Sequence, residues 1–259
     1  MSRSRWGLSW LSCLVLWSIS APSSAGEERK TSPDDSPQTP LVATFSIVAF
    51  DPQTQELGIA VQSRLPGVGA IVPYAQAGVG AVATQSLANT RFGPEGLKRL
   101  IAGKSPQEAI DEMIEADPER EARQLGIVDA QGRVASFTGD ECLNWAGSKT
   151  GENYTVQGNI LTGPEVIDEM ARAFEKTEGV LALRLLAALD AGQKAGGDRR
   201  GMQSAALLIV RDGWGYDGQS DRFRDLRVDD HASPIEELRR IYHVHRKVFR
   251  RPVLISDPE

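Results

Sequence analysis

The chain has 259 residues, of which 41% are hydrophobic and 25% are charged, and its formal net charge at pH 7 is −6. This composition is that of a globular protein with one sizeable core, and it excludes collagen-like, low-complexity and mainly disordered chains. The negative charge provides no basic footprint for nucleic acid or anionic lipid, so we expect neither as a partner.

The first 25 residues have the pattern of a secretory signal. Two arginines precede an apolar stretch, residues 6–19, and the small residues Ser23 and Ala25 stand before Gly26. The apolar stretch is shorter than the ~20 residues of a spanning helix, so a retained anchor is the weaker alternative. The sequence predicts cleavage after Ala25, export to the periplasm or the extracellular space, and no membrane segment afterwards.

Residues 26–43 read as a disordered linker. They include the run GEERKTSPDDSPQTP, which is rich in charge, Ser and Pro and poor in large apolar side chains. Such a segment cannot bury enough apolar surface to collapse onto a core. We therefore expect a single folded domain over residues 44–259.

The folded region begins with four apolar segments of strand length, followed by two helices. The strand segments are residues 44–50, 57–63, 70–75 and 78–86. Their connections are short, which favours antiparallel pairing. The second helix begins at Ser105, where Pro106 at the first helical position and Glu108 complete a capping box.

Strands and helices then continue in groups. Strand patterns cover residues 124–130, 133–139, 154–161, 204–210 and 224–231, and helices begin at Pro164, near Leu181 and at Pro234. Ser233 and Glu236 repeat the capping-box pattern at the last helix. Grouped rather than strictly alternating elements predict an α+β fold in which helices cover sheets, and not a doubly wound parallel sheet.

No metal or cofactor motif is present in the sequence. His243 and His245 lie two residues apart on a helix and face different sides, so they do not make a metal pair. Cys142, the one thiol left after signal removal, could form a thiol–imidazole pair with His231. The ordinary alternative, which we favour, is a small buried apolar residue. We predict no metal site and no cofactor.

Polar side chains stand at the ends of several predicted strands, where donors could converge on a ligand. The candidates for binding substrate or stabilising an oxyanion are Ser63, Arg64, Gln85, Asn89, Gln157 and Asn159. The alternative for each amide is that it caps a turn or satisfies backbone groups.

A glycine-flanked charged loop precedes the most apolar strand. It contains Asp198, Arg199 and Arg200, and arginine in such a loop can hold a carboxylate with two parallel hydrogen bonds. A solvated charged loop is the alternative. We predict that these residues lie at the same end of the sheet as Thr44 and bind an anionic group.

Several segments together resemble a known family: TFSIVAF, ELGIAVQSR, GVGAVATQS, RQLGIVDAQGRVASFTG, YTVQGNIL, GGDRRGMQSAALLIV and DLRVDDH. They are similar to the family catalogued as a domain of unknown function, number 1028, which is grouped with the N-terminal nucleophile (Ntn) hydrolases. The resemblance runs from about Thr44 to about His245. It implies a four-layer αββα sandwich and a nucleophile at Thr44, with the freed α-amine of that residue as the base.

The sequence departs from the Ntn pattern in three respects, one of which is that no Lys stands on the third strand. Residues 26–43 would remain ahead of Thr44 after signal removal, so its amine is acylated unless a second cut follows Ala43. Gln62 or Ser63 also stands where proteasome-like members carry an Asp on the second strand.

The sequence therefore favours a hydrolase of a small amide or peptide-like bond. Thr44 would attack, Gln157 and Asn159 would donate to the oxyanion, and Arg199 or Arg200 would hold a substrate carboxylate. The alternative is a non-catalytic, small-molecule-binding envelope protein with the same fold. The expected partner is a small molecule that can carry a carboxylate, and a homo-oligomer stays open as an alternative to a monomer.

Overall fold

The computed structural model describes residues 44–251. The predicted signal peptide, the predicted linker and residues 252–259 of the predicted domain lie outside this range. Within it, no helix combines the length and the apolar character that crossing a bilayer requires.

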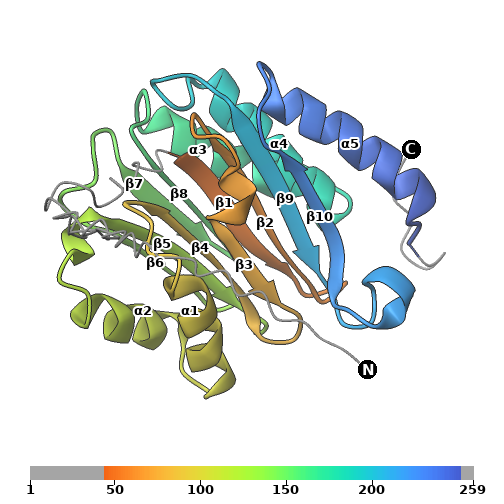
Figure 1. Ribbon diagram of the computed structural model, residues 1–259, viewed down its shortest axis with the longest axis horizontal. Coiled ribbons are helices and arrows are strands. Elements are labelled where there is room, and N and C mark those ends of the chain that lie inside the picture. The colour runs from red at the N-terminus through yellow and green to blue at the C-terminus, as the bar shows by residue number, and fades with distance from the viewer. Residues whose placement is uncertain (1–43, 252–259) are drawn as a thin grey trace, which may run out of the picture. The chain divides into compact units, whose positions relative to one another are not determined.

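Six antiparallel strands form the larger sheet (Figure 1). In spatial order they are β10 (Arg222–Val228), β9 (Ser204–Val210), β2 (Glu56–Ser63), β1 (Thr44–Asp51), β8 (Tyr154–Asn159) and β7 (Gly147–Gly151). The register places Thr44, the first residue of β1, between Ser63 on β2 and Asn159 on β8. The ends of three neighbouring strands therefore meet around Thr44.

The smaller sheet has four antiparallel strands. In spatial order they are β3 (Pro73–Gln76), β4 (Gly80–Ser86), β5 (Arg123–Asp129) and β6 (Val134–Thr138). It packs face to face against the larger sheet, with all four of its strands in contact and β4 and β5 lying against the central strand β1. Val48 and Ile59 from one sheet and Ala83 and Val128 from the other belong to the same buried apolar cluster.

The helices cover the outer faces of the two sheets (Figure 1). The smaller sheet carries α1 (Phe92–Ile101) and α2 (Pro106–Glu115), and the larger sheet carries α3 (Glu165–Lys176), α4 (Leu181–Lys194) and α5 (Pro234–Val248). Along β1, Phe45 and Ile47 face the helices while Val48 and Phe50 face the other sheet. This is the period-two alternation of a strand that is buried on both faces. The fold is thus mixed α+β with two antiparallel sheets, as the grouped order of elements predicts.

Two strand predictions differ from the structure. Residues 70–75 were expected as one strand, but Gly67 has a left-handed φ of 67° and starts a 3₁₀ turn at Val68–Ala70, so the strand begins only at Pro73. The sequence pattern also misses β7, because GSKTG has no apolar alternation. That strand lies at a sheet edge and needs few apolar side chains.

The two capping boxes have different outcomes. At α2 the prediction is confirmed, because Ser105 Oγ accepts from the Glu108 N–H at 3.2 Å and Glu108 Oε2 accepts from the Ser105 N–H at 2.8 Å. At α5 it is wrong, because the Ser233 side chain makes no capping hydrogen bond. His231 Nδ1 accepts the Ser233 N–H at 2.9 Å instead, so the ring occupies the donor that Glu236 would need.

Candidate functional site

Thr44 lies at one end of the space between the sheets. It is fully buried, and by strand alternation its side chain points to the same face as Ser46 and Val48, toward the smaller sheet. Its hydroxyl donates to Ser63 Oγ at 3.3 Å, and that oxygen also accepts from the Leu65 N–H at 3.1 Å. The sequence thus places a hydroxyl pair from β1 and β2 at the rim of the inter-sheet layer.

Behind Thr44 the two sheets are joined by buried amide side chains. Gln85 on β4 accepts from Ser46 Oγ at 2.6 Å and donates to Gln124 Oε1 at 2.8 Å. Its Nε2 is also 3.5 Å from the carbonyl oxygen of Thr44. Gln85 therefore links the smaller sheet to the first three residues of β1, through Ser46 and the Thr44 carbonyl.

Gln124 extends the same network across β5. Its Nε2 donates to the Gly158 carbonyl at 2.8 Å and to Thr138 Oγ1 at 3.0 Å, and its Oε1 accepts from Asn159 Nδ2 at 2.9 Å. All these hydrogen-bonding side chains are neutral. Satisfied buried networks of this kind fix a single geometry, so the surroundings of Thr44 are rigid and carry dipoles instead of full charges.

The two predicted oxyanion donors occupy different places. Asn159 lies directly opposite Thr44 in the sheet, whereas Gln157 lies opposite Ser46, two residues further in. Gln157 Nε2 donates to Ser46 Oγ at 2.6 Å, and its Oε1 accepts from Thr155 Oγ1 at 3.1 Å. The amide of Gln157 is thus committed to holding Ser46, and Asn159 is the residue of this pair placed at the Thr44 rim.

The charged loop lies at the same end of the sheet as Thr44. Asp198 Oδ2 accepts from the Arg64 N–H at 3.2 Å, just after β2 ends, and the Arg199 N–H donates to the Ile160 carbonyl at 2.9 Å, just after β8 ends. Because β1 lies between β2 and β8, the loop spans the two sides of the Thr44 end.

The arginines near this loop already have partners within the protein. Arg200 binds the buried Asp198 carboxylate with two prongs, at 3.2 Å from Nε and 3.0 Å from Nη2. Arg199 Nη2 donates to the Leu161 carbonyl at 3.2 Å, and Arg64 Nη1 donates to Gln203 Oε1 at 2.6 Å. The two-pronged grip expected for a substrate carboxylate is therefore made internally by Arg200.

Two non-glycine residues at this rim have left-handed backbones. Ser86 has a φ of 67° and follows Gln85, and Ile160 has a φ of 54° and follows Asn159. Such conformations cost about 1–3 kcal/mol each and are rare for a β-branched residue. Strain of this kind clusters at functional sites, and both residues adjoin side chains of the Thr44 network. Nothing in the residue types predicts it.

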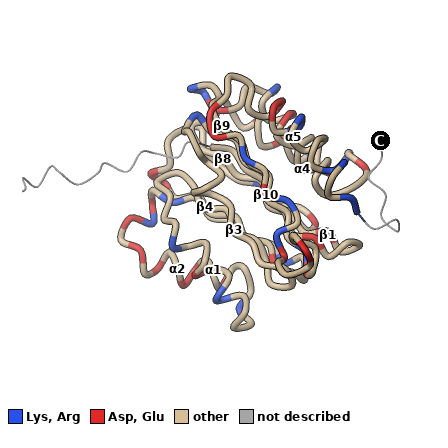
Figure 2. The backbone as a smooth tube through the Cα atoms, turned by 45° about the vertical axis from the view of Figure 1, so that its right-hand side comes forward, with Lys and Arg blue, Asp and Glu red and all other residues tan. Residues whose placement is uncertain are grey.

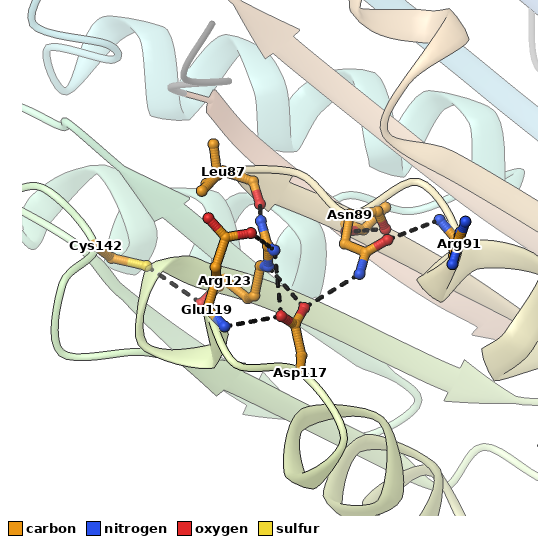
Figure 3. Close-up of polar contacts among 8 residues, drawn as sticks. Leu87, Asn89, Arg91, Asp117, Glu119, Arg123 and Cys142 are labelled. Carbon is orange, nitrogen blue, oxygen red and sulfur yellow. Dashed lines mark hydrogen bonds and ion pairs between the residues drawn. The ribbon is translucent and has the colours of Figure 1, made fainter. Parts of the chain in front are cut away.

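A second polar cluster, of which the sequence singled out only Asn89, lies beyond the end of β4 (Figure 3). Arg123 donates to Asp117 Oδ2 at 2.9 Å, to Glu119 Oε2 at 2.6 Å and to the Leu87 carbonyl at 2.5 Å. Asn89 Nδ2 donates to Asp117 Oδ2 at 3.1 Å. Burial alone would raise the pKa of Asp117, but the hydrogen bonds from Arg123, the Glu119 N–H and Asn89 outweigh it and lower that pKa.

Cys142 and His231 are not brought together. Cys142 is buried between β6 and β7 and its thiol donates to the Arg123 carbonyl at 3.3 Å, while burial raises its pKa against the opposing bond to Ser86. His231 follows β10, at the opposite edge of the larger sheet from β7. In the part of the chain that the structure describes, no group of three or more acidic, His or Cys side chains could hold a metal ion.

Comparison with known proteins gives a family and a fold. The model of a family of unknown function, DUF1028, matches residues 44–238. A crystal structure of a protein of this family from Silicibacter pomeroyi is 33% identical, covers 79% of this chain and 89% of its own, and superposes with a TM-score of 0.73. Anbu, an ancestral beta-subunit from Yersinia bercovieri, is 12% identical over 82% of this chain and 100% of its own. Its TM-score of 0.35 is too low to establish a common fold. No curated protein matches.

Proposed function

Because the chain belongs to the DUF1028 family, whose function is unknown, its activity has to be inferred from the site, and we propose that it hydrolyses a small amide through the Thr44 hydroxyl. The observation that carries the proposal is the position of Thr44. It starts a central strand, at the rim of the inter-sheet layer, with its hydroxyl 3.3 Å from Ser63 Oγ.

The layering of the fold is consistent with this chemistry. We propose that the two helix layers and two sheets correspond to the αββα sandwich of the Ntn hydrolases. Helices α1 and α2 on one side and α3 to α5 on the other, with face-to-face sheets between them, support that assignment.

The base in this proposal is the α-amine of Thr44 itself. The side chains hydrogen-bonded around Thr44 and Gln85 are Ser and Gln, which are poor proton acceptors at neutral pH. A free α-amine has a pKa of ~7.7–8.0, which suits a general base. The chain would have to be cut after Ala43 to release it, because a peptide nitrogen cannot take the proton.

The reaction would then follow acyl-transfer logic. The amine accepts the hydroxyl proton while Oγ1 attacks the amide carbon, and Asn159, opposite Thr44, would donate to the oxyanion in place of its bond to Gln124 Oε1. The C–N bond breaks, the leaving amine takes the proton, and water hydrolyses the resulting ester. We propose that the enzyme acts after export, once residues 1–25 have been removed.

One observation favours the alternative of a non-catalytic binding protein. Thr44 is fully buried, and its oxygen already has a neighbour in Ser63. A protein that keeps its peptide bond before Thr44 would retain the polar rim without a nucleophile. The two functions therefore differ in whether a free threonine amine exists.

The test compares protein that begins at Thr44 with protein that begins at Gly26, each against a panel of small amides. We expect hydrolysis only by the Thr44-initiated form, none after Thr44→Ala, and partial activity after Thr44→Ser, which keeps the hydroxyl. N-terminal sequencing and the intact mass of the natively exported protein then show which form exists. Equal activity of all forms would remove Thr44 from the mechanism.

A further inference from the structure

A cavity of about 470 Å³ lies beyond the end of β4. Its wall is the turn from Leu87 to Arg91, together with Glu119 and Arg123. Figure 3 shows the polar side chains of this region converging from the turn after β4 and from the connection that leads into β5. The cavity is large enough for a small molecule and is lined mainly by polar groups.

The cavity adjoins the Thr44 end of the inter-sheet layer. Gln85 contacts the Thr44 carbonyl oxygen at 3.5 Å, and Leu87 follows it by two residues, a chain length of about 7 Å. Ala88, the next residue of the wall, packs against the apolar cluster between the sheets. Thr44 itself is fully buried and is not part of the cavity wall, so the cavity is an approach to the proposed nucleophile and not its immediate surroundings.

Most charges in the cavity wall are neutralised within the protein. Arg123 is 7% exposed and binds both Asp117 and Glu119, while its Nη1 holds the Leu87 carbonyl. Asp117 also accepts from Asn89. These bonds fix the shape of the wall. Their donors are already used within the protein, and breaking them to bind a ligand would leave a buried charge without its partner.

Arg91 differs from the other arginines at this end of the fold. Its backbone N–H donates to Asn89 Oδ1 at 3.2 Å, but its exposed guanidinium makes no hydrogen bond or ion pair with any residue from 44 to 251. Arg64, Arg199 and Arg200 each have an internal partner. We propose that Arg91 binds a carboxylate of the substrate in this cavity.

The inference deepens the proposed hydrolysis, on which it rests for the identity of the reacting bond. The substrate class would be a small amide that carries a free carboxylate several bonds away from the scissile bond, because Arg91 lines the cavity and Thr44 does not. A charge-assisted pair with a guanidinium selects such a substrate over its neutral analogue.

Binding can be measured without turnover in the full-length Thr44→Ala protein. The probes are 6-acetamidohexanoate and its neutral carboxamide, titrated by ligand-observed NMR. We expect the carboxylate to bind more tightly than the carboxamide, and Arg91→Gln to weaken its binding roughly tenfold. Arg120→Gln is the matched control, because Arg120 is an exposed arginine close in sequence to the cavity wall whose side chain pairs with Glu121.

Three results would overturn the proposal: no binding of the carboxylate, equal weakening by Arg91→Gln and Arg120→Gln, or loss of binding in Arg199→Gln with Arg91→Gln unaffected. Thermal unfolding of Arg91→Gln, an exposed position, checks that the fold is retained. If carboxylate binding depends on Arg91 but the Thr44-initiated protein hydrolyses no amide, the carboxylate site is supported and the role of Thr44 as nucleophile is rejected.

Discussion

Gln85 is the residue on which the polar layer between the sheets depends. It is fully buried, and its amide both accepts from Ser46 and donates to Gln124. Leucine has a similar volume but no polar atoms, so Gln85→Leu would leave at least two buried polar groups with one partner fewer. A buried group left unsatisfied costs about 1–3 kcal/mol, and Gln124 Oε1 keeps its bond from Asn159, so we expect a loss of about 2–4 kcal/mol in the free energy of unfolding.

The matched control is Gln131→Leu, the same substitution at an exposed turn position. We expect a change within about 0.5 kcal/mol there, measured by urea unfolding in parallel. Similar losses for the two variants would show that the amide layer does not stabilise the fold.

Among the elements, α2 and α5 have similar residues at their N-termini but different N-cap hydrogen bonds. Ser105 caps α2 through its side chain, whereas Ser233 makes no such bond. Ser105→Ala should therefore lower the free energy of unfolding by about 1 kcal/mol, the usual value of an N-cap. Ser233→Ala should change it by less than about 0.5 kcal/mol. Chemical denaturation of both variants decides, and the reverse order would contradict the assignment of the caps.

This pair also shows what local sequence can predict. The pattern of a serine, a proline and a glutamate correctly places the start of both helices, because propensity and the missing proline N–H act locally. It cannot show that the His231 ring accepts the Ser233 N–H. For the same reason the edge strand β7, which has no apolar alternation, is absent from the sequence reading.

For the candidate site as well, the sequence predicts the positions of the strand ends but not the partners of the charged side chains. The strand ends that carry Ser63, Gln85 and Asn159 follow from apolar patterning, and they do meet near Thr44. The partners of the charged residues depend on tertiary contacts. Arg200 turns inward to Asp198, and Arg123 joins Asp117 to the turn after β4, so neither role could be assigned from spacing alone.

At the scale of the whole molecule, a buried ion pair ties the end of the described chain to the larger sheet. Arg251, just beyond α5, binds Glu56 at the start of β2, with Nη2 2.6 Å from Oε2 and exposed fractions of 1% and 0%. Removing one partner of such a pair leaves a buried charge and typically costs about 3–5 kcal/mol.

We therefore expect Glu56→Leu to destabilise the fold by about that amount, and the double variant Glu56→Leu with Arg251→Met to recover much of the loss. Thermal and urea unfolding of the single and double variants measure the coupling. A strictly additive double variant would mean that the pair does not act as a unit.

Arginines also recur along β10, the strand that packs against the last helix (Figure 2). Arg224 is fully buried there and its Nη1 donates to His245 Nδ1 at 2.8 Å, which requires a neutral imidazole. Burial, with the Arg224 charge adding to it, lowers the pKa of His245 from 6.5 to about 4. The packing of α5 on β10 thus depends on an uncharged histidine.

The sign of the pH effect follows from this pKa. The unfolded chain takes up the His245 proton near pH 6.5 but the folded protein only near pH 4, so stability is complete above pH 6.5 and declines as the pH falls toward 4. Because His245 is partly exposed, we discount the loss to about 1–2 kcal/mol. Carboxylates with a lowered pKa, such as Asp117, lose their contribution only at lower pH.

His245→Asn tests this directly, since an asparagine oxygen can accept from Arg224 but does not titrate. Urea unfolding between pH 7.5 and pH 4.5 should show a shallower decline for this variant than for the wild type. His243→Asn is run beside it, because burial followed by neighbouring basic residues also lowers the pKa of His243 and gives the same sign. If the loss of stability toward low pH is unchanged in His245→Asn and absent in His243→Asn, then His243, and not His245, causes the pH dependence.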